Sequence, residues 1–229
     1  MVPDSRYDLT LYELMRQYAE EKETPPAHEF PTPELGKTLS LFHTSLIEAG
    51  LEQRGTPVHP QLAAGPEELT LNHLSHFVVS FLPFNSITRK DEINEVLFEL
   101  YSFFQWLAKR DIGHGLQGVG LGKLIRDLSS MQDRCLRLSH LLDNESGRTL
   151  QDPPEIIQTL NDVFSVIKIE SEFVYLKASH HDETIRLRLP SHILSMMKLN
   201  DHLDLVLGDT AEKWVLLEAG QVFPQAPPG

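Results

Sequence analysis

The chain has 229 residues, of which 41% are hydrophobic and 23% are charged, as in a globular protein with at least one core. Its formal net charge is −13 and no segment is basic, which argues against sequence-independent DNA binding through clustered Lys and Arg. The single cysteine, Cys135, excludes an internal disulfide and a multi-cysteine zinc site. No apolar run approaches the roughly 18 residues of a membrane span, and no signal peptide is recognisable. We therefore expect a cytoplasmic protein without membrane contact.

Three segments follow one another along the chain, and together they predict an α+β fold. Residues 1–33 contain an amphipathic helix at 7–21, with Leu11, Leu14, Met15 and Tyr18 on one face, and then a linker with four prolines. Residues 34–150 are predicted to form a helical domain. Residues 151–229 are predicted to form a small β domain.

The helical domain begins with two helices that a break, RGTPVHPQLAAGPEE, separates. Thr70 is placed to cap the second helix, at 71–82, and Thr88 precedes a longer third helix. The third helix carries an apolar stripe at helical spacing. Its members are Ile93, Val96, Leu97, Leu100, Phe103, Phe104 and Leu107.

Residues 37–112 contain three segments in a fixed order and spacing: KTLSLFHTSLIEAGL, EELTLNHLSHFVVSFLP and SITRKDEINEVLFELYSFFQWLAKRDI. In this order and spacing they resemble the SAM-like core-binding domain of tyrosine recombinases and phage integrases. It implies a helical bundle that clamps duplex DNA with basic residues. The cations in position for such contacts include Arg89, Lys90, Lys109 and Arg110.

The catalytic half of a tyrosine recombinase is missing from this sequence. That family needs a tyrosine nucleophile near the C-terminus and a His-x-x-Arg motif. None of the eleven histidines has an arginine three residues later, and Tyr175 is the only tyrosine beyond residue 112. We therefore predict that the chain is not an enzyme.

Residues 121–142 contain a strict heptad repeat, which predicts a continuous apolar seam on one helix. The seam consists of Leu121, Leu124, Leu128, Met131, Cys135, Leu138 and Leu142. The flanking positions lack matched charge pairs, so the seam is expected to pack on a neighbouring helix of the same chain. A homodimer through this seam is the alternative.

Beyond NESGRTLQDPPE the apolar period changes from that of a helix to that of a strand. Strands are predicted at 163–169, 173–178 and 184–189, in LDLVL and in KWVLLE, with a short helix in SHILSMMKL. Five strands and one helix in this length indicate a small barrel or a strongly bent sheet. Residues 184–220 also resemble, faintly, the swapped-hairpin AbrB-like fold, which implies a dimeric β module.

No pattern in the sequence predicts a cofactor or a metal ion. His73 and His76 lie on the polar side of their helix, and His180–Glu183 are placed in a turn. The glycines of GHGLQGVGLGK follow a helix, where they are better explained as a hinge than as a phosphate-binding loop. The leading hypothesis is a regulatory or scaffolding protein that contacts a protein partner. The alternative is a DNA-associated accessory factor.

Overall fold

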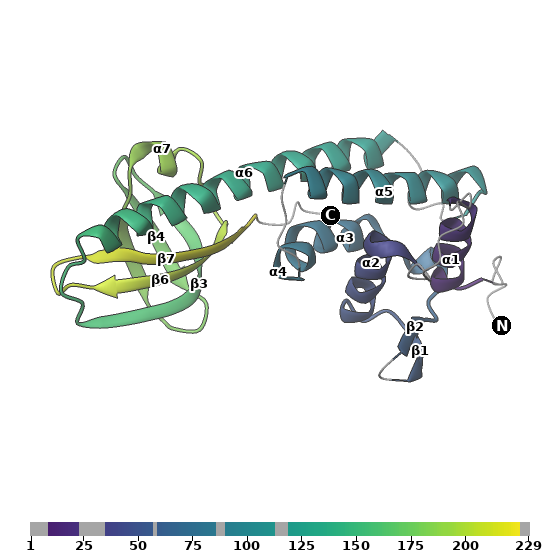
Figure 1. The fold of residues 1–229 in the computed structure, drawn as a ribbon, viewed down its shortest axis with the longest axis horizontal. Coiled ribbons are helices and arrows are strands. Elements are labelled where there is room, and N and C mark those ends of the chain that lie inside the picture. Colours follow the sequence, from purple (N-terminus) through teal and green to yellow (C-terminus); the bar gives the residue numbers. More distant parts are fainter. Residues whose placement is uncertain (1–8, 23–34, 57–58, 86–89, 113–118, 225–229) are drawn as a thin grey trace. The chain divides into compact units, whose positions relative to one another are not determined.

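A computed structural model describes residues 9–22, 35–56, 59–85, 90–112 and 119–224. The chain divides into two compact units, and each is described by itself (Figure 1). The first comprises the residues up to Leu82 together with Asp91–Ser129. The second comprises Ser130–Pro227 and the short stretch Pro83–Lys90. The predicted combination of helices and strands is confirmed, but the division falls inside one long helix and not at residue 150.

The helices of the first unit follow the predicted apolar stripes. They are α1 (Leu11–Lys22), α2 (Gly36–Glu48), α3 (Leu71–His76), a π-helical turn (Phe77–Phe81), α4 (Leu82–Asn85), α5 (Lys90–Lys109) and the start of α6 (Val119–Gln151). The four predicted apolar residues of α1 are buried, and so are all seven of the stripe on α5. Helix α3 begins after Thr70 as predicted, and the Thr70 amide donates a 3.2 Å hydrogen bond to His73 Nδ1. The prolines predicted as a linker, and Thr88, lie outside the described residues.

Aromatic rings fill the centre of the first unit. Phe42 of α2 contacts Phe77 and Phe104 edge-on, with ring centroids 5.2 and 6.2 Å apart. Tyr18 of α1 makes a similar contact with Phe103 of α5, at 5.3 Å. Such edge-to-face pairs add to the gain from burying the rings, so α5 joins α1 and α2 into one core.

The break predicted between the first two helices is a β-hairpin, formed by β1 (Gln53–Thr56) and β2 (His59–Leu62). Gly55 adopts a φ of 98°, a conformation that most residues avoid. Leu62 is buried, and its amide donates a 3.3 Å hydrogen bond to Nε2 of buried His43. A 3₁₀ turn (Pro66–Glu68) then leads to α3. Two of the prolines of this segment are thus placed where proline is tolerated, Pro60 in a strand of a two-stranded sheet and Pro66 at the start of the 3₁₀ turn.

Helix α6 is longer than the sequence predicts, because NESGRTLQ continues it to Gln151. Gly147 lies inside the helix, where it costs conformational entropy but breaks no hydrogen bond. The helix ends just before Pro153 and Pro154, whose rings exclude a further helical turn. The heptad predicts a helix over 121–142, and the structure extends this helix to Gln151, where the two prolines end it.

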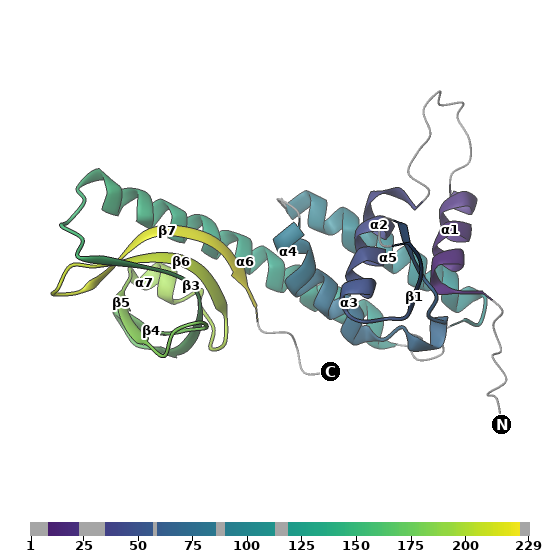
Figure 2. The same cartoon turned by 90° about the horizontal axis from the view of Figure 1, so that it is seen from below.

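The second unit contains a closed ring of five strands (Figure 2). The strands are β3 (Gln158–Ile169), β4 (Phe173–Ala178), β5 (Thr184–Arg188), β6 (His202–Asp209) and β7 (Trp214–Phe223), in the order β3-β4-β5-β7-β6. All neighbours are antiparallel except β5 and β7, which meet at one parallel pair, Leu187 and Trp214. Helix α7 (Ser191–Leu194) connects β5 to β6 and is shorter than predicted. Residues 184–220 thus contribute β5, α7, β6 and most of β7, and the swapped-hairpin resemblance of this segment stays a prediction.

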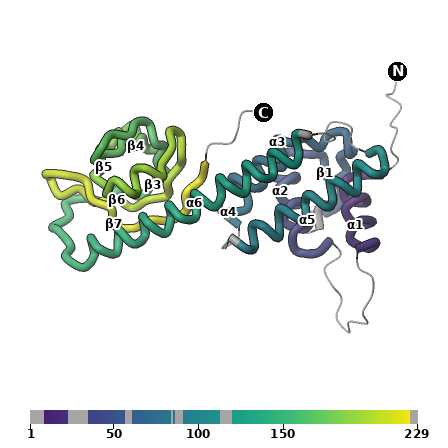
Figure 3. The backbone as a smooth tube through the Cα atoms, turned by 90° about the horizontal axis from the view of Figure 1, so that it is seen from above, coloured from purple at the N-terminus to yellow at the C-terminus, as the bar shows by residue number. Residues whose placement is uncertain are grey.

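The interior of the ring is apolar. Helix α6 runs along the outside of the ring next to β7 (Figure 3). Strand residues that alternate along the chain point inward, among them Val174, Leu176, Ile185 and Leu187. Cys135, Leu138 and Leu142 of α6 belong to the same buried cluster. Ser139 Oγ donates a 2.7 Å hydrogen bond to the Gly220 carbonyl, which ties this part of α6 to β7.

Candidate functional site

The four cations predicted to contact DNA do not form a basic cluster in the described part of the chain. Arg89 lies outside the described residues, Lys90 begins α5, and Lys109 is exposed near its end. Arg110 is occupied: its Nη2 lies 2.6 Å from Glu21 Oε2, and its guanidinium carbon lies 4.0 Å from the Trp106 ring centroid. The hydrogen bond from Trp106 Nε1 and the charge of Arg110 lower the pKa of Glu21. Arg110 therefore fastens α5 to α1.

The predicted heptad seam lies along α6 but contacts different partners at its two ends. Leu121 and Leu128 are buried in the first unit, and Leu124 and Met131 are half-buried. The last three residues, Cys135, Leu138 and Leu142, are buried in the ring of strands. Packing within the chain thus occupies the seam, partly against strands and not only against a helix. The homodimer through these residues stays a prediction.

The two histidine patterns have structural roles. His73 Nδ1 accepts the hydrogen bond from the Thr70 amide at the start of α3. His180 Nδ1 lies 2.8 Å from Oδ1 of buried Asp162, and the His180 amide donates to the other carboxylate oxygen. Burial raises the pKa of Asp162, but the hydrogen bonds from His180 and Val163 outweigh it and hold the pKa below its usual value. No group of three or more metal-ligating side chains is found within the described ranges.

A groove on the first unit is the strongest candidate for a contact surface there. It lies between α5 and the start of α6 and has a volume of about 410 Å³. Phe98 and Tyr101 lie on its α5 wall, and Ile125 and Arg126 lie on its α6 wall. Phe98 is 70% exposed, although its ring is large and apolar. A hydrogen bond of 3.0 Å between Ser129 Oγ and Asn94 Oδ1 joins the two walls.

The sequence contains a signal for this groove that catalytic motifs do not reveal. Phe98 and Tyr101 fall outside the apolar stripe of α5, three residues apart and therefore on one face. Neighbouring large apolar side chains outside the buried stripe form an exposed apolar patch, and such patches occur where proteins bind partners. The sequence does not show that Ile125 and Arg126 of α6 lie opposite Phe98 and Tyr101.

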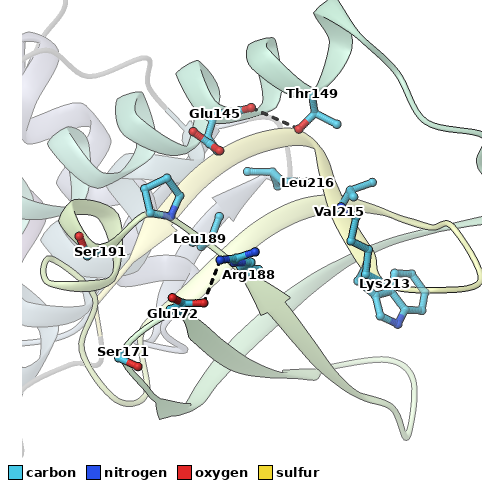
Figure 4. Close-up of a pocket in the computed structure, with 12 residues that line it drawn as sticks. Glu145, Thr149, Ser171, Glu172, Arg188, Leu189, Ser191, Lys213, Val215 and Leu216 are labelled. Carbon is cyan, nitrogen blue, oxygen red and sulfur yellow. Dashed lines mark hydrogen bonds and ion pairs between the residues drawn. The ribbon is translucent and has the colours of Figure 1, made fainter.

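A pocket of about 610 Å³ opens on the second unit where β5 and β7 separate (Figure 4). Arg188 and Glu172 form an ion pair of 2.9 Å across one wall, and Lys213 lies on the opposite wall. Glu145 and Thr149 of α6 border the pocket. Strands β5 and β7 pair only at Leu187 and Trp214, and Trp214 also lines the pocket. Charged and hydroxyl side chains, with Trp214, give this pocket the means to bind a polar ligand.

The helices that the structure describes include none long and apolar enough to cross a membrane. No protein-family model matches the chain. No curated protein and no solved structure matches it either. The resemblance to the core-binding domain of tyrosine recombinases therefore stays a prediction.

Proposed function

We propose that the chain is a non-catalytic scaffolding or regulatory protein that binds a protein partner through the groove between α5 and α6. In this proposal the helical unit is a SAM-like bundle and the closed strands are a small β-barrel attached to it by α6. The bundle is used for protein contacts and not for strand exchange. The exposure of Phe98 is the observation that carries the proposal.

The position of Phe98 favours a partner over a purely structural role. The inward side of α5 already buries seven apolar residues, so the stability of the bundle does not require the ring of Phe98. Covering a Phe ring on binding yields about 1.5–3 kcal/mol, which is enough to make it the centre of an interface. Tyr101, 36% exposed, adds a second ring one helical turn away.

The groove suits an amphipathic helix of the partner, because it runs between two helices and offers apolar side chains at helical spacing. The net charge of −13 would attract a partner segment with basic flanks. Duplex DNA binding through α5 gains no support from its cations, because Arg110 is paired with Glu21.

The experiment that tests this function places a photo-crosslinking amino acid at position 98 of the full-length chain in its native cells. The control places it at Ile157, which is 65% exposed but lies on the second unit. The proposal predicts one cross-linked protein from position 98 that is absent from position 157. Purified partner should then bind the chain, and Phe98→Glu should weaken this binding by about 2 kcal/mol or more.

Two outcomes would refute the proposal. In one, position 98 yields no cross-link, or yields the same products as position 157. In the other, the purified partner binds Phe98→Glu as tightly as it binds the natural chain. Circular dichroism and thermal unfolding of Phe98→Glu would show that the variant remains folded, since the substituted side chain is exposed.

A further inference from the structure

The outer surface of β3, β4 and β5 combines cations with aromatic rings. Side chains there alternate with the buried ones, so successive outward residues of each strand share this surface. We name this surface the cationic face. It consists of Lys168, Phe173, Tyr175, Lys177, Arg186 and Arg188.

The register of the strands brings these residues into rows across the sheet. Tyr175 pairs with Lys168 of β3 on one side and with Arg186 of β5 on the other. In the next row Phe173 lies opposite Arg188. Directly opposite residues in a sheet have Cβ atoms about 5 Å apart, so each ring has a cation beside it.

Two of the cations lie over aromatic rings. The guanidinium carbon of Arg186 is 3.5 Å from the centroid of the Phe173 ring, and Lys168 Nζ is 5.0 Å from that of Tyr175. Arg186 is exposed, so its guanidinium presents a flat, charged surface on the outside of the ring of strands. Nucleic-acid bases stack on surfaces of this kind, both aromatic and guanidinium.

Charge is distributed unevenly around the ring of strands. On the cationic face, Lys168 is paired with Glu170 and Arg188 with Glu172. Lys177 is exposed, and the charge of Arg186 contributes, after that of Lys168, to lowering the pKa of Glu170. Strands β6 and β7 carry the opposite charge on their outer side, where burial and the neighbouring Glu218 raise the pKa of Asp204. In a chain with a net charge of −13, the gathering of cations on β3–β5 is a local exception.

The pocket at the separation of β5 and β7 continues the cationic face at one end. Arg188 belongs to both (Figure 4), and the pocket is also lined by Lys213 and Trp214. The same stretch of α6 that packs on β7 lies on the side of the ring away from β4 and β5 (Figure 2). Within the second unit the four cations of the face are exposed, and its two aromatic residues are half-exposed.

We propose that the cationic face binds single-stranded nucleic acid, with bases stacked on Tyr175 and on the outer side of the Arg186 guanidinium, which the Phe173 ring supports from beneath, and with phosphates held by the lysines and arginines. Unpaired bases are required, because the rings of a duplex are stacked on one another and cannot reach these side chains. Small barrels are common scaffolds for such ligands, but the fold alone sets no ligand, and these side chains carry the inference. The activity lies beyond protein binding at Phe98 and does not depend on it.

The test measures fluorescence anisotropy of a labelled oligothymidylate of about 15 nucleotides, a length within the range that one small barrel covers. Full-length protein is titrated at about 50 mM and about 200 mM salt. The proposal predicts saturable binding that weakens with salt, and competition by unlabelled oligouridylate. A duplex of equal length should compete poorly.

Substitutions separate the contribution of base stacking to the binding affinity from the contribution of phosphate contacts. Phe173→Ala should weaken binding about 5-fold to 150-fold and leave the dependence on salt unchanged. The double variant Lys177→Gln with Arg186→Gln should make the logarithmic salt slope shallower by about 1.4, because each phosphate that a cation neutralises contributes about 0.7 to the slope. Arg137→Gln is the matched control, because it removes one exposed cation from α6 and should change neither quantity.

Any of three results would overturn the proposal. The oligonucleotide fails to bind at low salt, or Arg137→Gln weakens binding as much as the changes on the face. In the third, poly-glutamate competes as well as oligouridylate, which would identify a surface for acidic polypeptides. Loss of this activity would leave the binding of a protein at Phe98 unaffected, so the two proposals fail separately.

Discussion

Arg134 of α6 and Asp201, which precedes β6, form a buried ion pair in which two hydrogen bonds of 2.6 and 2.7 Å join the guanidinium to both carboxylate oxygens. The side chain of Asp201 is 2% exposed. Arg134 also donates to the Met196 carbonyl, and the Lys198 amide donates to Asp201. The hydrogen bonds to Asp201 raise the pKa of Arg134 despite its partial burial. Helix α6 is thereby fixed to the turn that links α7 to β6.

Replacing Asp201 with Asn is expected to lower the free energy of unfolding of the second unit by about 3–5 kcal/mol, because it leaves the Arg134 charge buried without a counter-charge. The two tryptophans lie in different units, so Trp214 fluorescence in a Trp106→Phe background follows the second unit during urea unfolding. The matched control is Asp133→Asn, which affects the surface pair with Arg137 on the same helix and should cost at most about 1 kcal/mol. Equal losses for the two variants would show that the buried pair contributes no special stability.

His43 gives the first unit a dependence on pH. Burial lowers the pKa of His43 below its usual value, and its Nε2 accepts the hydrogen bond from the Leu62 amide. The unfolded chain, with a His pKa of about 6.5, then binds more protons than the folded one. The stabilisation that neutral, buried His43 gives the first unit is therefore complete above pH about 6.5. It is lost as the pH falls from there towards the pKa of His43 in the folded chain.

The free energy of unfolding of the first unit should fall between pH about 7.5 and about 5.5, a window centred on the unfolded His pKa. We expect this fall to be smaller in His43→Gln than in the natural chain. Trp106 fluorescence in a Trp214→Phe background follows urea unfolding of the first unit. Burial and the neighbouring His76 also lower the pKa of His73. The pH dependence of His73→Gln is therefore measured beside that of His43→Gln, to separate the contributions of the two histidines. If His43→Gln retains the full pH dependence of the natural chain, His43 is not its source.

The elements that the sequence predicted correctly are those whose side chains repeat. Ile93 to Leu107 recur at helical spacing, and Ile185, Leu187 and Leu189 alternate, because one side of each element is buried. The β1–β2 hairpin could not be predicted in this way. It is short, and Leu62 is held by His43, a residue 19 positions earlier.

The candidate sites were less accessible than the fold, because they depend on pairs that are distant in the sequence. Arg110 was a plausible DNA contact until its partner Glu21, 89 residues away, was known. The outward direction of Arg186 and Arg188 was predictable from alternation. Their placement beside Phe173 and Tyr175 follows from the register of β4 and β5, which no local pattern fixes.

Cys135 is expected to be unreactive towards thiol reagents in the folded protein. It is 1% exposed, and burial raises its pKa to about 12, so almost no thiolate is present at neutral pH. Reaction with an aromatic disulfide reagent should therefore require opening of the second unit and accelerate with urea. The control moves the cysteine to the exposed neighbour in a Cys135→Ala, Arg137→Cys variant, which should react at once without urea. Fast reaction of the natural chain would contradict the burial.

Leu138 separates the two interpretations of the heptad seam. It is fully buried in the cluster that α6 shares with the strands, so Leu138→Ala should destabilise the second unit by about 2–5 kcal/mol through the cavity it leaves. Urea unfolding followed by Trp214 fluorescence measures this loss. Sedimentation velocity of the same variant should show no change of mass, because the side chain packs within its own chain. A natural chain that sediments as a dimer, and a variant that sediments as a folded monomer, would instead place Leu138 in a contact between two copies.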